Sequence, residues 1–130
     1  MTSLKKILHV EDEDDIREIT KLVLESIGGF EVVSCSSGQA ALEKVRDFMP
    51  DLIVLDVMMP GMDGPATLAA LRHLAASADI PVIFMTAQSR PQECEQLMDL
   101  GAMGIITKPY DPQTLPEQLH TVWNMRGNVS

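Results

Sequence analysis

Asp56 is a carboxylate that closes a strand-like run of residues. It ends the apolar run 51–56, and the segment that follows, Val-Met-Met-Pro-Gly-Met-Asp-Gly, would continue neither a helix nor a strand. In a parallel α/β sheet, ligands gather at the carboxyl edge, because each strand fixes its last side chain there while the loops vary. Asp56 is therefore the first candidate for a functional residue.

A second group of acids follows another short apolar run. Residues 11–15 read Glu-Asp-Glu-Asp-Asp and come directly after the strand-like residues 7–10. A block of like charge is usually a solvated segment. Here a helical pattern follows the block, so the acids occupy a strand-to-helix turn at the same sheet edge as Asp56. Carboxylates from two strand ends, foremost Glu11, Asp12 and Asp56, could converge there.

Converging carboxylates imply a partner of opposite charge. They repel one another unless a cation neutralises them or one of them is protonated. Ligation by oxygen alone, without His or Cys in these turns, favours Mg²⁺ over Zn²⁺. Mg²⁺ commonly bridges carboxylates to phosphoryl oxygens, and an aspartate can act as a nucleophile that becomes an aspartyl phosphate. The expected chemistry is therefore phosphoryl transfer.

Two more strand-like runs end in polar residues suited to that chemistry. Residues 80–86 end at Thr86, and residues 104–108 end at Lys108. A threonine supplies a hydroxyl donor and a lysine supplies a mobile ammonium group. Around a phosphorylated aspartate, both groups would bind the phosphoryl oxygens that the metal leaves free.

The alternation of strand and helix signals predicts the scaffold. Five strand patterns alternate with five helix patterns, which indicates a doubly wound, flavodoxin-like α/β fold with five parallel strands in the order 2-1-3-4-5. The expected strands are 7–10, 30–35, 51–56, 80–86 and 104–108, and the expected helices are about 14–27, 38–48, 65–76, 90–100 and 115–125. Gly28 and Gly29 should end the first helix.

Local signals fix several helix ends. Ser37 can cap the second helix, and Pro65 fits the first turn of the third. Capping boxes are predicted at Ser89-Arg-Pro-Gln92 and at Thr114-Leu-Pro-Glu117, the latter with Pro116 in the tolerated first turn. Helical spacing predicts that the first helix buries five apolar residues, namely Ile16, Ile19, Leu22, Val23 and Ile27.

Composition predicts one compact domain over residues 1–130. A formal net charge of −9 and a pI near 4.6 argue against a nucleic-acid surface. No signal peptide or bilayer-spanning stretch is evident, and Cys35 and Cys94 are expected to be reduced thiols in the cytoplasm. His9 is interpreted as a core residue, and His73 and His120 as solvated helix residues.

Taken in order, these motifs resemble the receiver domain of two-component response regulators. The resemblance covers residues 5 to about 125. It rests on Glu11 with Asp12, Asp56 before Met-Met-Pro-Gly-Met-Asp-Gly, Thr86 before Ala87, and Lys108 before Pro109.

The resemblance implies a role for each of these residues. Asp56 would accept a phosphoryl group from a phosphohistidine of a sensor histidine kinase or a histidine phosphotransfer protein. Thr86 and Lys108 would bind the phosphoryl oxygens. Mg²⁺ would be arranged by Glu11, Asp12, Asp56 and the main-chain carbonyl of Met58. Such a protein is a signalling phosphoacceptor and not an enzyme in the ordinary sense, since its only chemistry is its own phosphorylation and dephosphorylation.

Two positions depart from the family pattern. Glu11 replaces the more frequent aspartate and lengthens one arm of the metal site. Ile105, three residues before Lys108, stands where the family usually has an aromatic switch residue. We expect a stand-alone receiver without an output domain, whose fourth helix, fifth strand and fifth helix form the face that binds a downstream protein.

Three alternatives compete with this interpretation. A haloacid-dehalogenase-like phosphatase also uses an aspartate nucleophile and Mg²⁺, but it needs a second aspartate two residues later, where this chain has Met58. A non-phosphorylated pseudo-receiver scaffold would normally have lost some of the site residues. A receiver from a hybrid kinase remains open.

Overall fold

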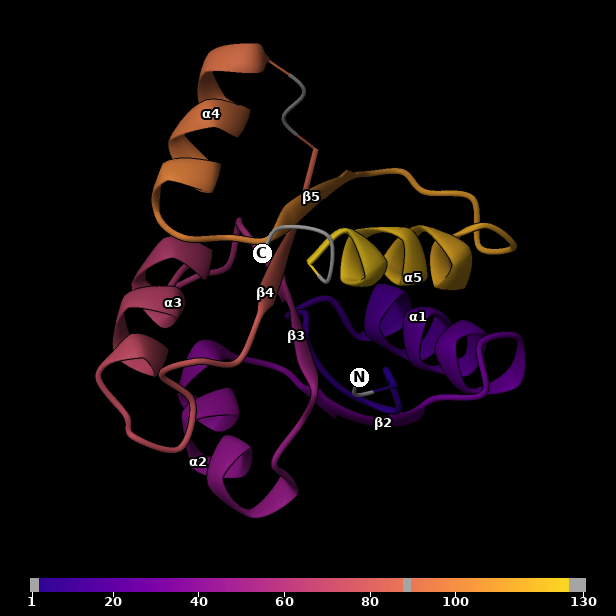
Figure 1. Cartoon of the computed structure of the whole chain (residues 1–130), viewed down its shortest axis with the longest axis horizontal. Helices are drawn as coiled ribbons and strands as arrows, with labels where there is room; N and C mark the ends of the chain where they lie inside the picture. Colours follow the sequence, from indigo (N-terminus) through magenta and orange to yellow (C-terminus); the bar gives the residue numbers. More distant parts are fainter. Residues whose placement is uncertain (1–2, 88–89, 127–130) are drawn as a thin grey trace.

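The fold is a five-stranded parallel sheet with helices on both faces (Figure 1). The computed structural model describes residues 3–87 and 90–126. The strands are β1 (Lys6–Val10), β2 (Glu31–Cys35), β3 (Leu52–Asp56), β4 (Val82–Thr86) and β5 (Gly104–Thr107). The helices are α1 (Asp14–Ser26), α2 (Gly38–Phe48), α3 (Gly64–Arg72), α4 (Pro91–Asp99) and α5 (Leu115–Arg126). The order β2-β1-β3-β4-β5, with parallel pairing throughout, confirms the predicted fold class.

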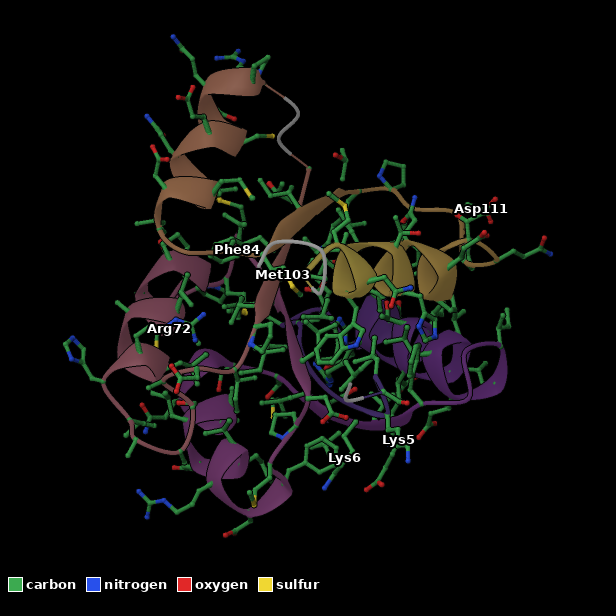
Figure 2. All side chains as sticks on the ribbon, viewed as in Figure 1. Lys5, Lys6, Arg72, Phe84, Met103 and Asp111 are labelled. Atoms are coloured by element: carbon green, nitrogen blue, oxygen red, sulfur yellow. The ribbon has the colours of Figure 1, made fainter. Side chains whose placement is uncertain are left out.

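Two hydrophobic clusters, one on each face of the sheet, form the core. Helices α2, α3 and α4 cover one face, and α1 and α5 lie side by side on the other (Figure 1). Neighbouring residues of one strand enter opposite clusters, as Ile7 and Leu8 do on β1. Side chains fill both layers in Figure 2, where the labelled Phe84 is a fully buried member of the first cluster. β3 and β4 are buried throughout, as central parallel strands covered on both faces must be.

Local capping explains where several helices begin. The Ser37 side chain accepts a hydrogen bond from the main-chain N–H of Ala40, and Asp63 accepts one from Ala66. Pro65 lies in the first turn of α3 and Pro116 in the first turn of α5, as their sequence positions predict.

One predicted helix end was wrong, and the residue expected to cap another helix lies outside the described residues. α3 ends at Arg72 instead of continuing to about residue 76, because the chain turns there and is held by side chains: the Ser77 hydroxyl donates to the Leu71 carbonyl (2.6 Å) and Arg72 to the Ile80 carbonyl (2.8 Å). The N-cap of α4 is Arg90, whose side chain makes no capping hydrogen bond. Ser89, which opens the capping box expected there, lies outside the described residues.

The buried face of α1 is narrower than its apolar pattern predicts. Thr20, Val23 and Leu24 are buried, whereas three of the residues expected in the core are exposed: Ile19 (52%), Leu22 (62%) and Ile27 (55%). The reason is that the contacts of α1 with the sheet, with α5 and with the loop after β5 are narrower than its apolar stripe, so part of the stripe remains in solvent.

The histidines and cysteines lie as expected. His9 is buried on β1, while His73 and His120 are exposed, and the ring of His120 packs against Phe30. Cys35 and Cys94 are free thiols. Within residues 3–87 and 90–126, no helix combines the length and the apolar character needed to cross a bilayer.

Candidate functional site

Four of the predicted site residues meet at the carboxyl edge of the sheet. Glu11 follows β1, Asp56 ends β3, Thr86 ends β4, and Lys108 follows β5. The strand register places Asp56 beside Met85, one residue from Thr86, so these residues lie at the same level of the sheet. The convergence expected from the sequence is therefore present.

The acids form a tight cluster. Glu11, Asp12 and Asp56 each offer a carboxylate oxygen, and these atoms all lie within 4.8 Å of one another. Glu11 and Asp56 are buried, and Asp12 is half-buried. Burial, followed by a hydrogen bond with the Glu11 carboxyl group and repulsion from its charge, raises the pKa of Asp12. Such a set of hard oxygen donors fits Mg²⁺.

Lys108 joins two of the acids. Its Nζ lies 2.6 Å from Glu11 Oε1 and 2.9 Å from Asp56 Oδ1. Burial alone would lower the pKa of this ammonium group, but the hydrogen bonds to Glu11 and Asp56 outweigh burial and raise it. Lys108 therefore stays charged. One ammonium group cannot balance three ionised carboxylates, so the cluster keeps a negative charge that a divalent cation would neutralise.

The acidic turn is also held from within. The main-chain N–H of Glu13 donates to Glu11 Oε2 (3.2 Å). Arg17 donates through one guanidinium nitrogen to the carbonyls of Glu11 (3.0 Å) and Asp12 (3.4 Å), and through another to Asp14 (2.5 Å). Arg17 is not among the site residues predicted from the sequence. Its spacing of three residues from Asp14 on a helix was the available signal.

The loop after Asp56 folds closely against the end of β3. Gly64 donates its N–H to the Val57 carbonyl (2.9 Å) and closes the loop. A Cβ at Gly64 would lie only 2.6 Å from the Asp56 carbonyl oxygen, so this position requires glycine. The Met58 side chain is exposed (69%). A ligand role for the Met58 carbonyl stays a prediction.

Thr86 and Ile105 lie on the same face of the sheet. Thr86 is buried, and its carbonyl accepts a hydrogen bond from the Lys108 main-chain N–H (2.7 Å). Phe84 pairs with Ile105, and Thr86 pairs with Thr107, so Ile105 lies on the neighbouring strand two residues before the partner of Thr86. Ile105 is half-buried and packs against the cluster under α2, α3 and α4.

His9 lies on β1, two residues before Glu11, and carries no charge at neutral pH. Burial, with smaller contributions from the nearby charges of Lys108 and Arg17, lowers its pKa to about 3. Its Nδ1 has no hydrogen-bond partner among the described residues. His9 is therefore a neutral core residue, as the sequence analysis expected.

Comparisons with known proteins agree with this geometry. A family profile for the response regulator receiver domain matches residues 7–120. The phosphate regulon transcriptional regulatory protein PhoB of Klebsiella pneumoniae is 36% identical over 118 residues, which is 91% of this chain and 51% of that protein. The transcriptional regulatory protein CseB of Streptomyces avermitilis is 35% identical over 130 residues, 100% of this chain and 54% of that protein.

The chain thus spans about half the length of the curated relatives that it matches. Among solved structures, the chemotaxis protein CheY4 of Vibrio cholerae superposes with a TM-score of 0.84 and 31% identity. That match covers 92% of this chain and 99% of CheY4.

Proposed function

Because this chain belongs to the receiver-domain family of response regulators, whose members are signalling phosphoacceptors, we propose that Asp56 is the residue that accepts the phosphoryl group. The observation that carries the proposal is the convergence of Glu11, Asp12 and Lys108 on the Asp56 carboxylate. Glu11 is a poorer candidate because Lys108 engages one of its oxygens and the Glu13 N–H engages the other.

The transfer needs no proton from Asp56. An ionised oxygen of Asp56 attacks the phosphorus of a phosphohistidine, the new O–P bond forms, and the N–P bond breaks with its electron pair left on the imidazole nitrogen. The Lys108 ammonium, already 2.9 Å from Asp56, can bind a phosphoryl oxygen as the carboxylate charge is consumed. We assign the same task to the Thr86 hydroxyl.

The residues present fit a magnesium ion. Glu11, Asp12 and Asp56, together with the Met58 carbonyl, would hold it, and their oxygens are the ligands that Mg²⁺ prefers. A bound Mg²⁺ neutralises charge between the carboxylate nucleophile and the phosphoryl oxygens. Glu11 is longer than the aspartate usual at its position, and the bond from the Glu13 N–H keeps its side chain turned back on the acidic turn.

The experiment is phosphorylation by a small donor. Purified protein is incubated with acetyl phosphate and Mg²⁺, and its intact mass is measured. We expect the wild type to gain one phosphoryl group and Asp56→Asn to gain none. Asp47→Asn, which changes an exposed acid on α2, is the matched control and should label like the wild type. Labelling of Asp56→Asn at the wild-type rate would refute the assignment.

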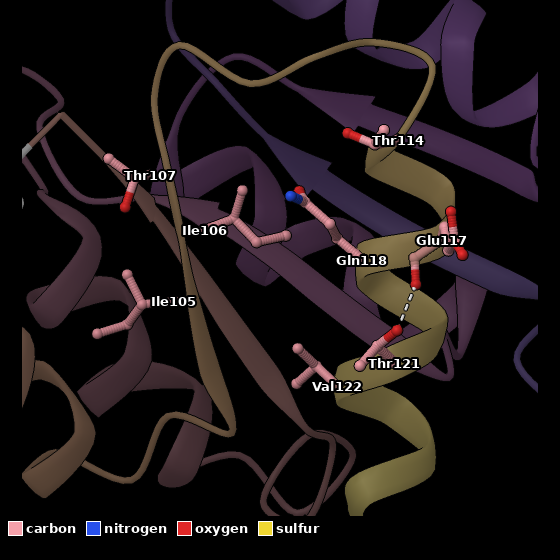
Figure 3. A pocket seen from close by; sticks show the side chains of 8 residues that line it. All are labelled: Ile105, Ile106, Thr107, Thr114, Glu117, Gln118, Thr121 and Val122. Atoms are coloured by element: carbon pink, nitrogen blue, oxygen red, sulfur yellow. Dashed lines mark hydrogen bonds between the residues drawn. The ribbon is translucent and has the colours of Figure 1, made fainter.

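The phosphodonor is proposed to be a sensor histidine kinase or a histidine phosphotransfer protein. For the output, we propose a change in protein binding on the face built from α4, β5 and α5. A groove of about 500 Å³ lies on this face between β5 and α5 (Figure 3). Its lining is mixed, with Ile105 and Val122 beside Glu117, Gln118 and three threonines. Such a surface suits a protein partner better than an acidic nucleic acid.

The pseudo-receiver alternative predicts a different labelling result, and the hybrid-kinase alternative predicts the same one. A pseudo-receiver scaffold would take no label. The position of Lys108 between two buried acids argues against this alternative, because a scaffold has no need for that arrangement. A receiver within a hybrid kinase would use the same site, so the assignment of Asp56 applies to it as well. A cytoplasmic location and chemistry restricted to the protein's own phosphorylation and dephosphorylation are part of this proposal.

A further inference from the structure

Helix α1 contacts the loop that carries Lys108 through one buried hydroxyl. Thr20, near the middle of α1, is fully buried, and its hydroxyl is hydrogen-bonded to the hydroxyl of Tyr110. Tyr110 follows Lys108 by two residues. A buried hydroxyl is costly unless it has a partner, so this pair is a specific contact between α1 and the loop after β5.

The same face of α1 also holds the acidic turn. Arg17 precedes Thr20 by three residues and therefore lies on the same side of the helix. It donates to the carbonyls of Glu11 and Asp12, the residues next to the candidate metal. One helix thus contacts both charged arms of the site, the metal-binding turn and the Lys108 loop.

The main chain around Lys108 has two anchors. On one side, its N–H donates to the Thr86 carbonyl of β4 (2.7 Å). On the other side, Tyr110 bonds Thr20 of α1. The Lys108 side chain is long and flexible, and its ammonium has to exchange a carboxylate oxygen for a phosphoryl oxygen during transfer. Because the main chain is held on both sides of Lys108, the ammonium group stays within the site while it changes from one oxygen to the other.

We propose that α1 is the positioning element of this site: Thr20 and Tyr110 are positioning residues for Lys108, and Arg17 is a positioning residue for the acidic turn. The proposal rests on the proposed phosphoacceptor function. It assigns roles to three residues that contact neither the phosphoryl group nor the metal in that function.

Deleting single hydroxyl groups tests the Lys108 arm. Tyr110→Phe and Thr20→Val each remove one hydroxyl and nearly keep the side-chain shape. We expect each to lower the rate constant for labelling by acetyl phosphate by about fivefold, with the Mg²⁺ dissociation constant unchanged. The double variant should be no slower than the single ones, because both remove the same bond. Ser26→Ala, which removes an exposed hydroxyl from the last turn of α1, is the matched control and should label like the wild type.

A double-mutant cycle with Lys108 separates a positioning effect from an effect on general stability. In a Lys108→Ala background, Tyr110→Phe should cause no further slowing, because the residue that it positions is gone. Arg17→Lys keeps the charge but cannot serve both carbonyls and Asp14. It should weaken Mg²⁺ binding severalfold, whereas Tyr110→Phe should not.

Amide hydrogen exchange measures how firmly the loop is held, and it does not depend on phosphorylation. The Lys108 N–H should exchange about fivefold faster in Tyr110→Phe than in the wild type, while the amides of β1 keep their rates. Unchanged exchange at Lys108 overturns the positioning role whether or not the wild type takes a label. Slowing by Tyr110→Phe that persists in the Lys108→Ala background also overturns it. A wild type that takes no label contradicts the proposed function instead, and the exchange rates still decide the positioning.

Discussion

At the scale of single residues, the site is a balance of charges. Three carboxylates lie within 4.8 Å of one another, and Lys108 bonds two of them. The third, Asp12, is the acid whose pKa is raised, and it lies next to the other two without such a bond to Lys108. Each member of the cluster therefore contributes differently to stability and to metal binding.

The raised pKa of Asp12 gives a prediction of two opposite effects. A carboxyl group with a raised pKa in the folded state favours folding below its ordinary pKa, and that contribution is lost as the pH rises through the folded value. At pH 7, Asp12→Asn should therefore raise the stability of the metal-free protein, by up to about 1 kcal/mol. It should also weaken Mg²⁺ binding, because a ligand is lost. Thermal melts with and without Mg²⁺ measure both effects, and equal stabilisation of variant and wild type by Mg²⁺ would sink the ligand assignment.

At the scale of elements, strand ends could be predicted well and packing partners could not. Asp56 and Thr86 each end an apolar run, and Ser37 and Pro116 mark helix starts through local backbone chemistry. The exposure of Ile19 and Leu22 depends on which elements cover α1, which no local pattern contains. The Thr20–Tyr110 bond joins residues 90 positions apart, so sequence spacing could not reveal it.

Two glycines of the loop after β3, Gly61 and Gly64, give a prediction at this scale. At Gly64 a Cβ would approach the Asp56 carbonyl oxygen at 2.6 Å and the Val57 Cα at 2.8 Å. Gly64→Ala should therefore cost about 1–3 kcal/mol and slow the labelling of Asp56, because the end of β3 has to shift. The matched control is Gly61→Ala. Gly61 has a positive φ of 73° but open space around its Cβ position, so this change should cost about 1 kcal/mol and leave labelling intact.

Urea unfolding and labelling rates of the two glycine variants provide the comparison. If Gly64→Ala labelled at the wild-type rate, the close contact with Asp56 would have no role in placing the carboxylate.

At the scale of the whole molecule, one buried histidine links stability to pH. The pKa of His9 is lowered to about 3 in the fold by burial, with Lys108 and Arg17 as the nearby charges, against about 6.5 when unfolded. A lowered pKa means that this contribution to stability is complete above pH 6.5 and is lost as the pH falls toward 3. By pH 5 the loss should reach about 2 kcal/mol.

Chemical denaturation at several pH values tests this dependence. His9→Leu should lack the decline between pH 7 and pH 5, because it has no proton to bind in the unfolded state. His73 and His120 are exposed, so His120→Gln serves as the control and should keep the wild-type decline. A decline of the same size in His9→Leu would show that other groups cause it.

The second prediction at this scale concerns transmission to the output face. Ile105 is β-branched and cannot swing as a flat ring does. We predict that switching relies on a change in the packing of α4 and in the segment 87–91, of which residues 88 and 89 lie outside the described residues. Ile105 should keep one rotamer. Crystal structures with and without a phosphoryl mimic measure this, and a flip of Ile105 toward Thr86 with α4 unmoved would contradict it.

The most direct test of the central claim is to locate the phosphoryl group on the chain. Protein labelled with acetyl phosphate is digested and mapped by mass spectrometry, with Mg²⁺ present or removed by EDTA. We predict a single label on the peptide that contains Asp56, formed only with Mg²⁺ and released by hydroxylamine, as an acyl phosphate requires. A label on another peptide, a label that resists hydroxylamine, or one that forms equally well in EDTA would contradict the assignment of Asp56 as the magnesium-dependent phosphoacceptor.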